Sequence, residues 1–142
     1  MRRIVQFAFI LFLFSSCNQE VEKAPVKEKK KFEMYKYSEM AALMRQMYSI
    51  NEALKIRIES GEDLGTFPTE FEQILNAEMT KKQKRDDFFE KHSSLFLESQ
   101  RKIYANPKDA KALYNESINS CVECHRTKCP GPIEKIKHLE LK

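Results

Sequence analysis

Two cysteines and a histidine stand within five residues near the end of the chain, in Cys121-Val-Glu-Cys-His125. On a helix, residues three and four positions apart share a face, so both thiols and the imidazole would point the same way. Cys-x-x-Cys-His is the attachment signature of c-type haem. Each thiol adds across one vinyl group of the macrocycle, and the adjacent histidine is the proximal iron ligand. The stretch predicts one covalently attached haem c, with thioethers at Cys121 and Cys124 and His125 on the iron.

Two other interpretations of these residues stay open. Cys129 follows four residues after His125, and Cys121, Cys124, His125 and Cys129 together could bind zinc, although their spacing is more compact than in most zinc folds. A disulfide between Cys121 and Cys124 would suit an oxidising compartment, but it would leave His125 without a role. With haem attached, we expect Cys129 to be a free thiol packed near the haem edge, with a redox or ligand role as the alternative.

The first sixteen residues have the pattern of an export signal. Two arginines precede an apolar run from Ile4 to Phe14, and two serines follow it. The run is shorter than the roughly 20 residues needed to span a bilayer. The next residue is Cys17, and Phe-Ser-Ser-Cys resembles the lipobox of bacterial lipoproteins, whose cysteine is lipidated. We therefore predict a signal peptide over 1–16, a lipid anchor on Cys17, and an extracytoplasmic location in the periplasm or at the cell surface. An ordinary secretory signal with a coincidental cysteine is the alternative.

Residues 17–31 contain the lipidated cysteine and a charged segment without apolar periodicity, which predicts a solvated tether. Residues 1–31 hold 7 basic and 3 acidic residues out of 25 and 21 in the chain. Residues 32–142 therefore carry 18 of each sign and are neutral. The excess of basic residues belongs to the signal and the tether, so it gives no argument for nucleic-acid binding.

The segment 32–129 has an all-helical composition. It holds only two prolines and two glycines, all at places where helices would begin or end, and it is rich in Ala, Leu, Met, Glu, Lys and Gln. Four apolar stripes with short connections predict an antiparallel four-helix bundle that carries the haem on its last helix. The predicted helices span residues 32 or 38 to 60, about 68 to 79, 81 to 105, and 106 through the haem motif.

The last thirteen residues, 130–142, form a tail after the haem motif. Apolar residues recur in it at three-residue steps, at Ile133, Ile136 and Leu139. This pattern predicts a short helix folded back over the bundle.

A helical bundle with Cys-x-x-Cys-His on its last helix resembles the cytochrome c-prime family, the class II cytochromes c. Mitochondrial-type cytochromes carry the motif near the N-terminus instead. Low-spin members of the family resemble a run Ala-Val-Met-Lys-x-Met on the first helix, followed six residues later by Ala-Leu. Here the corresponding residues are 42–47, Ala-Leu-Met-Arg-Gln-Met, and then Ala53-Leu54.

The resemblance implies that Met44 is the distal iron ligand, with Met47 or an open sixth position as alternatives. Taken alone, methionines at helical spacing are more often core residues. The family often has an arginine near a haem propionate four residues before the methionine. Met40 stands there in this chain, so Arg45 or another basic residue would have to take that role. Among the other histidines, His92 is expected at the core boundary, and His138 is a weaker candidate for the distal position.

The sequence thus predicts a membrane-tethered monohaem cytochrome that carries electrons between redox partner proteins. No acid–base pair, nucleophile triad or phosphate-binding loop is recognisable, so no enzyme activity is expected. The alternative is a five-coordinate haem protein that binds nitric oxide or carbon monoxide. The family resemblance also allows the bundle to pair into a homodimer.

Overall fold

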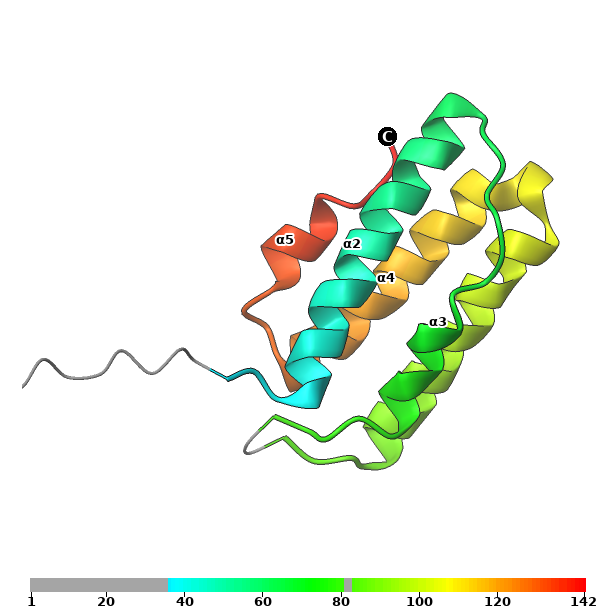
Figure 1. Cartoon of the computed structure of the whole chain (residues 1–142). Coiled ribbons are helices and arrows are strands. Elements are labelled where there is room, and N and C mark those ends of the chain that lie inside the picture. Colours follow the sequence, from blue (N-terminus) through cyan, green and yellow to red (C-terminus); the bar gives the residue numbers. More distant parts are fainter. Residues whose placement is uncertain (1–35, 81–82) are drawn as a thin grey trace, which may run out of the picture. The chain divides into compact units, whose positions relative to one another are not determined.

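A computed structural model describes residues 36–80 and 83–142 (Figure 1). The predicted signal peptide, Cys17, the tether and residues 32–35 of the first predicted helix lie outside the described residues. Every regular element within the described ranges is helical, so the prediction of an all-α fold is confirmed. None of these helices has the combination of length and apolarity required to cross a membrane.

Three long helices dominate the described part of the chain: α2 (Glu39–Ser60), α3 (Asp87–Ala105) and α4 (Ala110–Lys128). Helix α4 runs antiparallel to both of the others (Figure 1). It packs most extensively against α3 and less extensively against α2. Within residues 36–80 and 83–142, three short elements accompany them: the 3-10 helices η2 (Thr69–Leu75) and η3 (Pro107–Asp109), and helix α5 (Ile133–Lys137).

Helix α2 begins and ends at clear sequence signals. The Ser38 hydroxyl accepts a hydrogen bond from the Ala41 amide at 3.2 Å, which satisfies one free donor of the first turn. Gly61 ends the helix in the left-handed region, with φ at 69°, where a side chain would be strained. The start at Ser38 and the end at Ser60 agree with the sequence prediction.

The prediction of a second helix over about residues 68 to 79 is wrong, because this segment forms only the seven-residue 3-10 helix η2. Its buried side chains, Phe71 and Ile74, are three residues apart, and side chains at this spacing align in a 3-10 helix. The following segment then leaves the helical path to bond with the start of α2. The Met40 amide donates to the Glu78 carbonyl at 3.0 Å, and the Glu78 amide donates to the Glu39 carboxylate at 2.8 Å. These bonds favour an extended chain where a helix was expected.

Helix α3 starts later than predicted. Residues 83–86 are not helical, and Asp86 caps the helix by accepting a hydrogen bond from the Phe89 amide at 3.0 Å. The predicted start at residue 81 lies outside the described residues. The fourth helix opens as a short 3-10 turn at Pro107, which becomes α-helical at Ala110. The proline at the first position agrees with the sequence prediction.

The core consists of two apolar clusters. The first, here called the tail cluster, joins α4 to the C-terminal tail and the end of α2. The second, here called the methionine cluster, joins the start of α2 to η2 and α3. Cys121 packs against both, so the segment Cys121–His125 begins where the two clusters meet. The tail cluster holds Leu54, Leu64, Ile103, Ala110, Tyr114, Ile118, Val122, Ile136, Leu139 and Leu141, and the methionine cluster holds Met40, Leu43, Met47, Phe71, Ile74, Ala77, Phe89, Phe96 and Leu97.

The C-terminal tail is fastened by side chains of α2 and α4. Leu139 and Leu141 are buried in the tail cluster. Asn115 exchanges two hydrogen bonds with the backbone of Leu141, at 2.8 and 2.9 Å. Lys55 donates to the carbonyls of His138 and Glu140, at 3.0 and 2.8 Å. The tail is therefore part of the folded domain.

Candidate functional site

The three motif residues lie in the second half of α4. Cys121, Cys124 and His125 are all partly buried and belong to one turn and a half of helix. Cys121, Cys124 and Cys129 are free thiols. The alternative of a disulfide between Cys121 and Cys124 is therefore not found in this structure. Both motif thiols are thus available for thioether formation.

The His125 ring is oriented by the backbone. Its Nδ1 lies 3.0 Å from the carbonyl oxygen of Cys129. A carbonyl can only accept, so Nδ1 carries the proton and Nε2 keeps its lone pair. Burial lowers the pKa of the imidazole, against a smaller opposing effect of this hydrogen bond. Such a neutral ring, with one nitrogen held by a backbone carbonyl, has the form that metal-ligating histidines take.

The same two residues are also joined through the backbone. The Cys129 amide donates to the His125 carbonyl at 2.9 Å, which ends α4 with a last helical hydrogen bond. The Cys129 carbonyl is therefore fixed relative to the imidazole. The role of Cys129 toward His125 is carried by its main chain, because its side chain is exposed.

The two motif thiols are held in the protonated form. Burial raises the pKa of Cys121 to about 12. Burial also raises the pKa of Cys124, while the nearby Lys128 ammonium opposes the shift and Asp86 adds to it. The folded chain therefore keeps both sulfurs as weakly reactive thiols.

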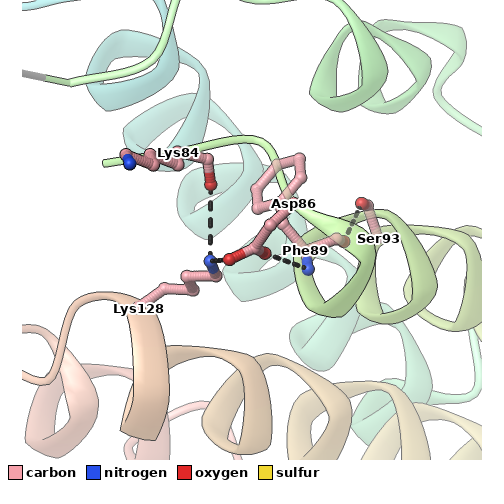
Figure 2. A network of polar contacts seen from close by, with 5 residues as sticks. All are labelled: Lys84, Asp86, Phe89, Ser93 and Lys128. Carbon is pink, nitrogen blue, oxygen red and sulfur yellow. Dashed lines mark hydrogen bonds and ion pairs between the residues drawn. The ribbon is translucent and has the colours of Figure 1, made fainter. Parts of the chain in front are cut away.

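A polar network ties the end of α4 to the start of α3 (Figure 2). Lys128 donates to the Asp86 carboxylate and, at 3.3 Å, to the Lys84 carbonyl, and only 14% of its side chain is exposed. Asp86 also caps α3 through the Phe89 amide. The hydrogen bond from Lys128, assisted by the Phe89 amide, lowers the pKa of Asp86. The turn that follows His125 is thereby fixed against a second helix.

The three methionines of α2 differ in their exposure. Met40 and Met47 are buried, at 6% and 5% exposure, inside the methionine cluster. Met44 is only half-buried and packs on the margin of that cluster, as Cys121 does. Met44 is therefore the methionine whose sulfur is not committed to the interior of the core.

The remaining candidates are distributed over the surface. Arg45 is exposed, and its guanidinium donates to the Tyr37 hydroxyl at 2.8 Å and lies over the Tyr37 ring. His92 is partly buried, with its ring centroid 4.2 Å from that of Phe88. His138 is exposed at the end of α5.

The four residues considered as zinc ligands do not form such a site. Within residues 36–80 and 83–142, no three His, Cys, Asp or Glu side chains are grouped as metal ligands. This finding does not bear on haem iron, which takes one histidine from such a set and is otherwise held by the macrocycle.

The sequence did not reveal the roles of several residues in this region. The spacing of four between His125 and Cys129 signals a contact within one turn, although nothing in it identifies a carbonyl as the partner. Asp86 precedes a helical pattern and could have been recognised as a cap. Gln100 interrupts the apolar stripe that includes Phe96 and Ile103, and this is the usual sign of a buried polar contact.

Comparisons of the chain with protein-family models, with curated proteins and with solved structures give no significant match.

Proposed function

We propose that this protein is a monohaem c-type cytochrome of the class II, four-helix-bundle kind, acting as an extracytoplasmic electron carrier. Cys121 and Cys124 hold the haem through thioethers, and His125 is the proximal ligand. The fold in this proposal places η2 where the second long helix of the family would stand. Helices α2, α3 and α4 supply the other three walls of the bundle.

The observation that carries the proposal is the state of His125. Its Nδ1–H is donated to the Cys129 carbonyl, so Nε2 is the nitrogen left to coordinate iron. Two free thiols stand four and one residues before it on the same helix. A histidine that served only as a core residue would not need this combination.

When bound, the haem supplies a single-electron exchange between ferrous and ferric iron. The residues of the chain hold the group, orient the proximal imidazole and exclude water. Apolar residues of both clusters meet at Cys121 and provide the dry surroundings that influence the reduction potential. The chain is thus a carrier, and no enzymatic step is assigned to it.

Met44 is proposed as the distal ligand. It lies on α2 at the margin of the methionine cluster, against which Cys121 also packs. Its thioether is less buried than those of Met40 and Met47. Methionine–histidine ligation raises the reduction potential relative to two nitrogen ligands and gives a low-spin iron.

The proposal includes attachment to a membrane through a lipid on Cys17. The charged tether to residue 31 would then give the haem domain reach toward redox partner proteins. Neutral overall charge in residues 32–142 provides no strong steering toward a highly charged partner.

The test is the visible absorption spectrum of the protein matured together with haem-attachment machinery. A sharp α band after reduction, with a methionine–iron charge-transfer band after oxidation, supports the carrier. Replacing Met44 by alanine should abolish the charge-transfer band, whereas replacing the buried Met40 by leucine should leave it. A five-coordinate, high-spin spectrum that changes on addition of nitric oxide would favour the gas-binding alternative and contradict ligation by Met44.

A further inference from the structure

A buried amide network joins the three long helices. Gln100 of α3 is fully buried, and its amide nitrogen donates to the Asn51 side-chain oxygen on α2 and to the Ser117 hydroxyl on α4, each at 2.7 Å. The Asn51 amide nitrogen donates to the Met47 carbonyl at 2.9 Å. The Tyr114 hydroxyl donates to the Asn51 carbonyl, also at 2.9 Å.

In this network the amide nitrogens of Gln100 and Asn51 and the hydroxyls of Ser117 and Tyr114 are paired, whereas the buried side-chain oxygen of Gln100 has no hydrogen-bond partner among the described residues. Shifting α2 by one residue rotates its side chains by about 100°. Asn51 would then turn away from Gln100, and the hydrogen bond between the two side chains would be lost, although Gln100 would keep Ser117 and Asn51 would keep the Met47 carbonyl. The apolar residues around them have no such directional requirement, and they would tolerate several registers. A buried polar contact of this kind is a recognised means of fixing helix register.

The register that allows the hydrogen bonds of the network also fixes the position of Met44 along the axis of α2 relative to α4. Asn51 lies seven residues after Met44 on α2, which is two helical turns or about 10 Å. Ser117 lies seven residues before Cys124 on α4. Because α2 and α4 are antiparallel (Figure 1), the two offsets run in the same direction. Because Gln100 joins Asn51 to Ser117, these two residues stand at the same height along the helices. Met44 therefore stands at the height of Cys124 and His125.

We propose that Asn51, Gln100 and Ser117 are positioning residues for the distal methionine. They fix the register of α2 against α4, and this register keeps the Met44 thioether opposite the proximal histidine. The inference rests on the proposed function, because a distal ligand is needed only if iron is bound at His125. It assigns the network to coordination geometry rather than to stability, since leucine at Asn51 and Gln100 would fill similar space and would remove the buried amides, leaving the Ser117 hydroxyl without its amide partner.

The experiment uses the full chain, matured with haem attachment, in the double variant Asn51→Leu with Gln100→Leu. Mass spectrometry after denaturation reports the covalent haem, and the oxidised visible spectrum reports the methionine–iron bond. The reduced protein is also titrated with carbon monoxide. We expect the haem mass to be retained, the charge-transfer band to lose most of its intensity, and carbon monoxide binding to increase at least tenfold. The exposed Gln46→Leu on α2 is the matched control and should leave all three readouts unchanged.

A merely structural network would give a different result. The double variant would then keep its charge-transfer band, whether or not it unfolds more easily than the wild type. A retained band overturns the proposal. If the double variant does not accumulate, Ser117→Ala removes a single partner of Gln100 and is judged by the same band. Wild-type protein with covalent haem but no charge-transfer band overturns this inference and the assignment of Met44 as distal ligand, but leaves covalent haem attachment standing. Wild-type protein without covalent haem overturns the proposed function as well.

Discussion

The cysteines of the motif and Cys129 differ in environment, and this difference governs their reactivity. In the haem-free chain, Cys129 is exposed, whereas Cys121 is partly buried with a pKa of about 12. At pH 8 such a thiol is almost entirely protonated and therefore weakly nucleophilic. We predict that an alkylating reagent modifies Cys129 first and Cys121 last, as followed by peptide mass spectrometry over time. Equal rates at the two cysteines would show that the motif is not packed as described.

The Cys129 side chain is predicted to be dispensable for the haem. It is the carbonyl of this residue that orients His125, and the carbonyl is unaffected by a change of side chain. Cys129→Ser should therefore keep the covalent haem and the visible spectrum of the wild type while removing one reactive thiol. Cys124→Ser is the contrasting variant, because it should retain only one thioether. A changed charge-transfer band in Cys129→Ser would assign the sulfur a ligand or redox role.

At the scale of elements, the C-terminal tail is predicted to contribute to stability. Leu139 is 4% exposed in the tail cluster, and Leu139→Ala should lower the free energy of unfolding by about 2–4 kcal/mol. Leu95 of α3 is 45% exposed, and Leu95→Ala should change it by no more than about 0.5 kcal/mol. Chemical denaturation of both variants measures the difference. Equal effects would mean that the tail does not pack on the core in solution.

Asp86 links α3 to α4, because its carboxylate both caps α3 and binds a lysine of α4. Asp86 caps α3 and is the ion-pair partner of the mostly buried Lys128. Asp86→Asn should keep the cap and lose the charge, whereas Asp86→Ala should lose both. The thermal midpoint should therefore fall further in the alanine variant. Identical midpoints would mean that the cap contributes nothing measurable.

The helices that could be predicted are those with sharp signals at their ends. Ser38 and Gly61 delimit α2, and Pro107 marks the start of the fourth helical segment, as expected from residue type alone. The second helix was mispredicted because its apolar spacing fits both an α-helix and a 3-10 turn. The choice between them depends on long-range bonds to α2, such as that from Met40 to Glu78, which leave no local trace.

In the candidate site too, the features that depend on local sequence could be predicted, whereas those that depend on contacts between helices could not. The spacing within Cys121–His125 is local and was recognisable, because one helix carries all three groups. The partner of His125, the link to Asp86 and the amide of Gln100 belong to tertiary structure. They become visible only when several helices are assembled, and they are also the contacts that fix the geometry of the site.

The stability of the haem-free molecule should depend on pH through His125. Burial lowers the pKa of this imidazole in the folded state, so the unfolded chain takes up its proton at higher pH. The free energy of unfolding should therefore fall as the pH decreases below the ordinary histidine value of about 6.5, by at most about 1.4 kcal/mol per pH unit. The decline levels off once the folded state is protonated as well. His125→Gln should show a flatter profile between pH 7 and 5 in denaturant titrations, and an unchanged slope would contradict the assignment.

We propose above all that haem is attached covalently to Cys121 and Cys124. The most direct test is the mass of the acid-denatured protein after maturation with haem-attachment machinery, compared with the double variant Cys121→Ala with Cys124→Ala. We predict that the wild-type chain retains the mass of one haem under denaturing conditions, whereas the double variant retains none. A wild-type chain that carries no haem mass would contradict covalent haem attachment.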